Sequence, residues 1–271
     1  MKKIVVTLIA ISALCACEPV VDNKEVGSIL PESELQLDVH ATTTGGNEIV
    51  MINNTPKVGS YWDYVTDVSV NQKDTVLLPF LGEQVITFTG FCDGGTVTTT
   101  RTVNITTIDH AVAAEWKLFA GSGEAGKTWV WDSSATDDIV YGTAGYLADS
   151  APGWTVISAG EVDDATDEML FDLNGGPNYT KKSADGSIIE KGSFKFNMSK
   201  KKDQDNGEPW SIGQLQIVGA TVLSGHSAYD QEDIINTFDI IELTEDKLVL
   251  AYAADGSVAW DEATFWCFKK K

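Results

Sequence analysis

The chain has 271 residues, with 40 acidic and 19 basic side chains and a net charge of −21. So negative a surface argues against binding to nucleic acid and against electrostatic docking on anionic lipid. The 4 cysteines and 3 histidines form no CxxC, no HxxxH and no Cys/His cluster. The sequence therefore shows neither a zinc site nor a cysteine nucleophile.

The chain begins MKKIVVTLIAISALCAC, residues 1–17, which has two lysines, an apolar run and then small residues. This pattern predicts a secretory signal, because the apolar run is shorter than the roughly 20 residues of a transmembrane helix. The motif LCAC at 14–17 resembles a bacterial lipobox. That resemblance implies a signal peptide at 1–16 and lipidation of Cys17. An ordinary signal peptide cut near Ala16 is the alternative.

Residues 17–34 are polar and contain Pro and Gly, so we expect a lipidated tether that anchors the mature chain to a membrane. Removing residues 1–16 takes away two lysines and no acids, which moves the net charge from −21 to −23. Lipid on Cys17 leaves Cys92 and Cys267 as thiols. They fall in different predicted domains, so we expect no disulfide between them.

Short runs of Val, Ile, Thr, Phe and Trp are broken by Gly, Asn and Asp, and long helical periodicity is absent. This pattern is typical of all-β proteins, and the length favours two domains. We place the first at 35–110 and the second at 111–271. The expected strands of the first domain are 35–42, 47–54, 60–65, 74–80, 84–92 and 96–106.

The first domain carries Tyr61-Trp62-Asp63-Tyr64, followed by DTVLLPFLGEQVITFTGFCDGGTVTTTRTVNIT at 74–106. These segments resemble PKD domains, an immunoglobulin-like family. The resemblance implies a β-sandwich with Trp62 in its core, and a domain that acts as a spacer. The chain departs from the family at 65–67, where Val-Thr-Asp replaces a Gly-Asp-Gly turn.

The second domain has hairpin-type turns between successive strands, which favours an antiparallel meander that closes into a barrel. Residues 238–250 and 265–270 resemble the closing strands of lipocalin-like domains in Bacteroidota lipoproteins, and Trp116 stands where those domains place an opening Trp. The expected strands are 115–121, 127–132, 140–147, 153–158, 168–173, 179–183, 187–197, 211–219, 236–244, 247–254 and 262–270.

The order of lipobox, tether, PKD-like sandwich and Trp-rich domain resembles the PKD-containing lipoproteins of Bacteroidota glycan-utilisation systems. The resemblance implies a lipid-anchored protein of the outer membrane, exposed at the cell surface. It also implies binding of a polysaccharide for a neighbouring outer-membrane transporter, without catalysis. Fold-level similarity alone does not establish that function.

Seven of the 8 tryptophans lie in the second domain, several beside acidic or amide side chains. Proteins bind sugars with aromatic platforms flanked by polar groups, because the ring stacks on the sugar while the polar groups orient it. The candidate ligand-binding residues are Trp131, Asp132, Tyr146, Trp154, Trp210, Trp260 and Glu262.

Trp154, Trp210 and Trp260 follow loop-forming residues, so we expect them to be exposed, whereas Trp116 and Trp266 lie in apolar strands and are expected in the core. In KTWVWD, 127–132, the two Trp rings share one face of a strand. That face meets either the core or a ligand at the barrel mouth. Asp132 makes Trp131 the ligand candidate, and Trp129 is assigned to the core.

Two other functions stay open. Residues 161–168, EVDDATDE, begin like the E-x-D-x-x-E signature of laminarinase-type glycoside hydrolases, but Thr166 replaces a Glu and the polar flanks favour an acidic loop. We assign no catalytic residue. The other alternative is a structural accessory that binds an outer-membrane protein through a chain whose tryptophans are all core.

No cofactor or metal is assigned. Calcium stays open, because the carboxylates of 163–168 or of 203–208 could supply oxygen ligands. The lysines at 200–202 favour a plain charged hairpin tip at the second of these places.

Overall fold

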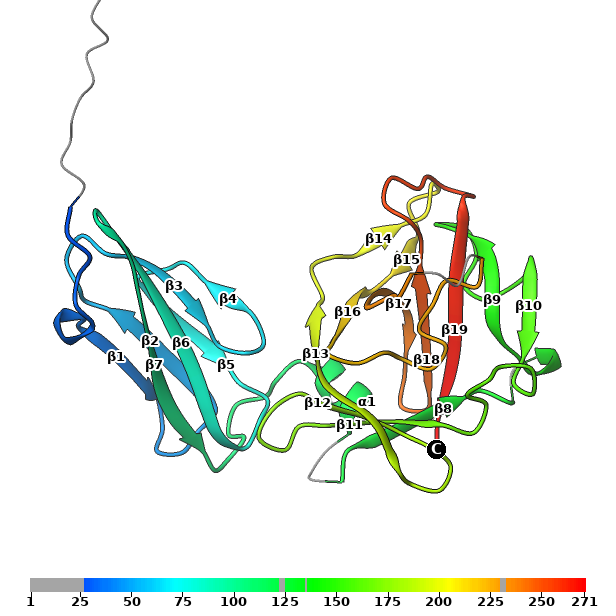
Figure 1. Ribbon diagram of the computed structural model, residues 1–271, viewed down its shortest axis with the longest axis horizontal. Coiled ribbons are helices and arrows are strands. Elements are labelled where there is room, and N and C mark those ends of the chain that lie inside the picture. The colour runs from blue at the N-terminus through cyan, green and yellow to red at the C-terminus, as the bar shows by residue number, and fades with distance from the viewer. Residues whose placement is uncertain (1–26, 122–124, 135, 230–232) are drawn as a thin grey trace, which may run out of the picture.

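A computed structural model describes residues 27–121, 125–134, 136–229 and 233–271. Figure 1 shows two β-rich domains side by side, which confirms the predicted all-β class. The predicted signal peptide, Cys17 and the first part of the predicted tether lie outside the described residues. Within the described ranges, no helix is both long enough and apolar enough to cross a membrane.

The first domain is a sandwich of two antiparallel sheets, in the orders β1-β2-β5 and β4-β3-β6-β7. Side chains of both sheets share one hydrophobic core. As predicted, Trp62 lies in this core, with its ring centroid 4.5 Å from that of Phe88. The elements are a 3-10 turn at Glu32–Glu34, β1 (Leu37–Ala41), β2 (Glu48–Asn53), β3 (Gly59–Asp63), β4 (Val68–Ser69), β5 (Lys73–Leu77), β6 (Gly82–Cys92) and β7 (Gly95–Ile105).

The second domain is an eight-stranded antiparallel barrel in the order β8-β11-β12-β13-β16-β17-β18-β19, closed by pairing of β19 with β8. The first part of β19 pairs with β9 instead, and β10 extends the sheet there. The strands are β8 (Lys127–Trp131), β9 (Ile139–Gly145), β10 (Thr155–Ser158), β11 (Glu168–Asp172), β12 (Asn178–Lys182), β13 (Ile188–Asn197), β14 (Lys202–Asp203), β15 (Pro209–Ser211), β16 (Gly213–Val218), β17 (Thr237–Leu243), β18 (Lys247–Tyr252) and β19 (Glu262–Lys270).

The strand predicted at 115–121 is wrong, because this segment forms the helix α1 (Ala114–Ala120). Alanine is the strongest helix former, and Gly121 ends the helix with a φ of 74°. The helix buries Phe119 among the barrel aromatics, 4.3 Å from Phe171 between ring centroids. The backbone groups of a short helix pair largely within the helix, whereas a strand at this place would need a neighbouring strand to pair with.

The two domains meet through an aromatic contact. Phe80 is fully buried and forms an edge-to-face pair with Trp116 of α1, at 5.4 Å between ring centroids. Beside it, Leu81 forms a parallel bridge with Asn174, and the Gln84 side chain donates to the carbonyl of Gly175 at 3.4 Å. Phe80 therefore owes its burial to the barrel domain as well as to its own.

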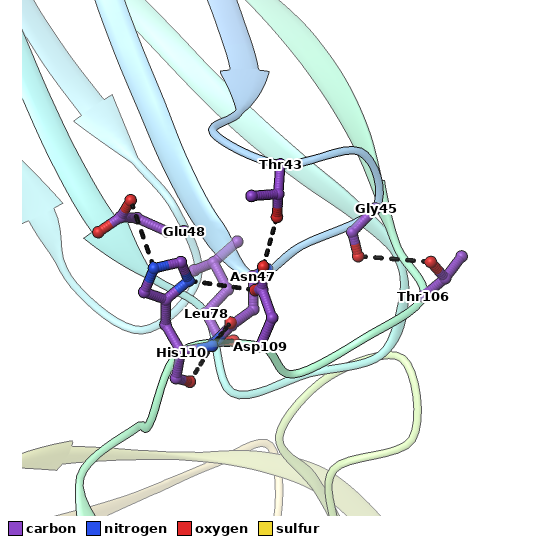
Figure 2. Close-up of polar contacts among 8 residues, drawn as sticks. All are labelled: Thr43, Gly45, Asn47, Glu48, Leu78, Thr106, Asp109 and His110. Carbon is purple, nitrogen blue, oxygen red and sulfur yellow. Dashed lines mark hydrogen bonds and ion pairs between the residues drawn. The ribbon is translucent and has the colours of Figure 1, made fainter.

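The chain leaves the first domain through a polar clamp built on the buried Asn47 (Figure 2). Its Nδ2 donates to the carbonyls of Leu78 and His110, at 3.2 and 3.0 Å, and its Oδ1 accepts the His110 N–H at 2.8 Å. Asp109 accepts from the Thr43 hydroxyl and from the Asn47 N–H. These hydrogen bonds lower the pKa of Asp109 to about 2, so the carboxylate stays charged through mildly acidic conditions.

Replacing Phe80 with alanine is expected to loosen the two domains, because it removes the ring that Trp116 packs against. Small-angle X-ray scattering of the variant should show a broader distribution of interdomain distances. Phe91→Ala is the control, since Phe91 is an exposed side chain of the same domain. An unchanged distribution for Phe80→Ala would show that the linker clamp alone fixes the orientation.

Candidate functional site

The barrel interior is filled by aromatic side chains. Trp129 and Trp266 are fully buried, and Trp131 is 2% exposed with its ring 4.7 Å from Phe268. Both rings of KTWVWD therefore face the barrel core. Trp266 is in the core as predicted. The choice of Trp131 as a ligand-binding candidate disagrees with its burial. Asp132 points to the other face, where its carboxylate accepts from the backbone and hydroxyl of Ser134 at 3.1 and 2.5 Å.

A loop that we call the mouth segment, residues 221–228, runs across one end of the barrel. It is held by the polar tips of interior aromatics, as Tyr179 donates to the Thr221 carbonyl at 2.7 Å and Tyr141 donates to the His226 carbonyl at 2.8 Å. Trp266 Nε1 donates to the Ser224 carbonyl at 2.8 Å. Buried Tyr and Trp side chains usually satisfy their donors in this way. Here the accepting carbonyls belong to the mouth segment, which is thereby tied to the barrel interior.

A cavity of about 530 Å³ lies beside the mouth segment and is rich in charged side chains. Most of its polar groups are already used by the protein, but Nδ1 of His226, which also lines the cavity, is buried without a hydrogen-bond partner among the described residues. Asp164 accepts from Trp131 Nε1 at 3.1 Å and from the Ser224 backbone at 2.6 Å, while Lys181 donates to the Thr221 hydroxyl at 2.6 Å. Glu190 accepts the Thr221 N–H at 2.6 Å. This network fixes the mouth segment and leaves His226 Nδ1 as the one buried side-chain atom of the described cavity lining without a partner.

The acidic run at 161–168 supplies part of that network. It is a loop that leads into β11 and not a catalytic strand, as the polar flanks predict. Ser158 donates to Glu161 through both its backbone and its hydroxyl, at 3.0 and 2.8 Å, which lowers the pKa of Glu161. A general acid needs a raised pKa, so Glu161 is poorly suited to that role.

A second cavity, of about 450 Å³, opens between the end of the mouth segment and the loop that joins β18 to β19. We call it the rim cavity. On one side of the cavity, the Thr264 hydroxyl accepts the Ala228 N–H at 3.0 Å and so holds the end of the mouth segment against β19. Its lining residues are Ser227, Tyr229, Asp233, Ile235, Tyr252, Ala253, Ala254, Ser257, Asp261, Glu262 and Thr264.

Two aromatic side chains at this place are largely exposed. Tyr229 lines the cavity and is 75% exposed, and Trp260, which precedes two lining carboxylates, is 63% exposed. Aromatic side chains usually bury 150–250 Å² of surface each, so exposure of this extent is unusual. Exposed large aromatics beside a hollow mark binding surfaces more often than single scattered apolar residues do.

The backbone of Trp260 is hydrogen-bonded although its side chain is exposed. Its backbone has a φ of 71°, which costs energy in a residue other than glycine, and its N–H donates to the Tyr146 carbonyl at 2.9 Å. The Tyr146 N–H in turn donates to the Asp261 carbonyl at 2.7 Å. The ring lies over Gly145, where an added Cβ would be 3.0 Å from a ring atom. Strain of this kind clusters at binding sites.

The expected exposure of Trp210 is wrong, because Trp210 is 4% exposed. The β14–β15 hairpin carries it onto the outer face of the barrel, where it packs 5.0 Å from Tyr146 and donates through Nε1 to the Asp149 carbonyl at 2.7 Å. Tyr146 is buried in the same cluster. Trp154 is 51% exposed, as predicted, but it precedes β10 and does not line the rim cavity.

Of the seven candidate residues, only Glu262 lines the rim cavity; Trp260 adjoins the lining residue Asp261 in the chain, with its ring against Gly145. Tyr229 and Tyr252 were missed by the sequence analysis, which followed tryptophans. An aromatic side chain within the polar stretch that surrounds Tyr229 was a usable signal, because such a stretch offers no core position. The approach of that loop to the β18–β19 loop depends on barrel closure.

Among the described residues, no three His, Cys, Asp or Glu side chains gather as metal ligands. The turn at 203–208 is the tip of the β14–β15 hairpin. Cys92 and Cys267 are both free thiols. Burial raises the pKa of Cys267 to about 12, which makes this thiol unreactive.

No family model matches the chain, and no curated protein matches it. Part of the chain is similar to the solved PKD1 domain of Epp from Vibrio anguillarum, with 19% identity over 26% of this chain and 89% of that one, and a TM-score of 0.23. The likeness is weak and carries no conclusion about this chain.

Proposed function

We propose that this protein is a non-catalytic glycan-binding lipoprotein, in which the rim cavity of the barrel holds a sugar and the first domain acts as a spacer. The observation that carries the proposal is the exposed ring of Tyr229 in the lining of a hollow fringed with carboxylates and hydroxyls. The exposed Trp260 immediately precedes the lining residues Asp261 and Glu262.

The chemistry of the rim cavity suits a sugar. A pyranose offers an apolar face of C–H groups, which stacks on an aromatic ring, and a fringe of hydroxyl donors. Glu262 and Asp261 can accept from such hydroxyls, and charge-assisted hydrogen bonds are about twice as strong as neutral ones. The hydroxyls of Ser227 and Ser257 can donate or accept. A few fixed polar groups beside apolar surface are typical of small-ligand sites.

We further propose that lipid on Cys17 anchors the chain in the outer membrane, exposed at the cell surface. In this arrangement the polar tether and the PKD-like sandwich lift the barrel away from the membrane. The Phe80–Trp116 contact supports a spacer that presents the barrel in a fixed orientation. A bound polysaccharide could then pass to a neighbouring outer-membrane transporter, as in the Bacteroidota systems that the sequence resembles.

Affinity electrophoresis of the purified full chain, in gels that contain different neutral polysaccharides, tests the binding function. We expect retardation in at least one gel and a marked loss of retardation for Tyr229→Ala. Trp154→Ala is the matched control, because it also removes an exposed aromatic side chain but lies away from the rim cavity. Lack of retardation by every polysaccharide would sink the proposal.

A further inference from the structure

We infer that the rim cavity selects uncharged glycans and rejects anionic ones such as polyuronates. This inference rests on the proposed function and adds the class of ligand. It follows from the sign and the pairing of the charges around the rim cavity.

The rim cavity is negative throughout. The residues of the described chain that line it include Asp233, Asp261 and Glu262 and no Lys, Arg or His. Asp261 accepts the Val258 N–H at 2.7 Å, which leaves its charge in place. A carboxylate ligand would therefore meet like charges with no cation to receive it.

Several carboxylates elsewhere in the barrel form ion pairs with lysines. Asp239 is paired with Lys202 at 2.7 Å, Glu190 with Lys181 at 3.7 Å, and Glu245 with Lys127 and Lys270 at 3.3 and 2.9 Å. By contrast, the side chains of Asp233 and Glu262 form no salt bridge with any residue that the structure describes. No neighbouring lysine therefore neutralises these two charges at the described lining of the rim cavity.

Unpaired carboxylates act in opposite ways on neutral and anionic sugars. A hydroxyl donates to a carboxylate, and that bond gains from the charge. The carboxylate of a uronate instead repels a protein carboxylate. At 4 Å this repulsion is about 1 kcal/mol in water and about 4 kcal/mol where the effective dielectric constant is near 20. The net charge of −21 adds a longer-range repulsion, which slows the approach of an anionic polymer.

The sharpest experiment compares one neutral polysaccharide that retards the protein with the same polymer after partial oxidation of its C6 hydroxymethyl groups to carboxylates. Backbone, length and linkage stay the same, so charge is the main variable. With the full chain in low-salt affinity gels, we expect the apparent affinity to fall at least tenfold on the oxidised polymer. Salt near 1 M should reduce this difference, because the Debye length shrinks to about 3 Å.

The double variant Asp261→Asn, Glu262→Gln removes two of the charges and keeps the shapes of both side chains. We expect its ratio of affinities for neutral and oxidised polymer to move towards one. Asp255→Asn is the control for a lost charge on the same loop away from the cavity lining, and its ratio should match that of the parent chain. Thermal unfolding checks that all variants fold.

Equal binding of both polymers by the parent chain, with binding still lost in Tyr229→Ala, would overturn the charge selection and leave glycan binding intact. An unchanged ratio in the double variant would overturn it as well. Failure of every neutral polymer to bind overturns the proposed function and this inference with it.

Discussion

Replacing Trp131 with alanine lowers the free energy of unfolding of the barrel by about 3–5 kcal/mol, the usual cost of truncating a buried Trp. The reason is the position of the ring, which is 2% exposed and packs 4.7 Å from Phe268 and 6.1 Å from Tyr141. Its Nε1 also donates to Asp164, which anchors the mouth segment. Urea unfolding followed by circular dichroism measures the loss.

Two further variants make this result specific. Trp131→Phe keeps a six-membered ring and loses the hydrogen bond and part of the buried volume, so it should cost less than Trp131→Ala. Trp154→Ala removes an exposed ring and should stay within about 0.5 kcal/mol of the parent chain. A stable Trp131→Ala that no longer binds glycan would place Trp131 in the binding site and contradict its core role.

Replacing Lys202 with methionine is expected to cost about 3–5 kcal/mol, because it leaves a buried carboxylate without its cation. Asp239 is 4% exposed, and its Oδ2 lies 2.7 Å from Lys202 Nζ. The same ammonium sits 5.0 Å from the centroid of the Tyr146 ring, which ties the β14–β15 hairpin to the outer face of the barrel. Urea unfolding of the variant measures the cost.

Two comparisons separate burial of the charge from loss of packing. Lys202→Met combined with Asp239→Leu should recover much of the stability, since an apolar pair can replace a buried ion pair. Lys247→Met breaks a solvent-exposed pair with Glu242, at 2.8 Å, and should cost at most about 1 kcal/mol. Equal losses for Lys202→Met and Lys247→Met would show that Asp239 is well hydrated.

The pair also predicts a pH dependence. Burial lowers the pKa of Lys202, but the hydrogen bonds and charge interactions with Asp239 and Tyr146 together outweigh it and raise the pKa above 10.5. A raised pKa stabilises the fold fully below the unfolded value near 10.5, and this stabilisation is lost as the pH rises through the folded value. The difference in stability between the parent chain and Lys202→Met should therefore narrow in strongly alkaline solution.

The barrel could be predicted because the sequence patterns that indicate its strands and turns are local. Alternation such as that in KTWVWD gives a strand, and the tight turns between strands favour neighbours in chain order. The helix α1 was missed because EWKLFAG is short, and its apolar residues fit either period. Tertiary packing decides such a segment, here through burial of Phe119.

The candidate site was predictable only in part, because exposure depends on partners that lie far away in the sequence. Trp210 and Trp260 both follow loop-like residues, yet a hairpin folds Trp210 onto Tyr146 while Trp260 stays at the surface. The rim cavity joins Tyr229 to Glu262 across the intervening strands β17 and β18. No local pattern encodes that approach.

Isothermal titration calorimetry of the full chain and its Tyr229→Ala variant, with a glycan that binds the parent chain, tests the rim cavity most directly. We expect the variant to fold normally and to bind about 5- to 10-fold more weakly, since loss of one aromatic contact is worth about 1 kcal/mol. Trp154→Ala should bind like the parent chain. Unchanged affinity for Tyr229→Ala, with reduced affinity for Trp154→Ala, would contradict binding at the rim cavity.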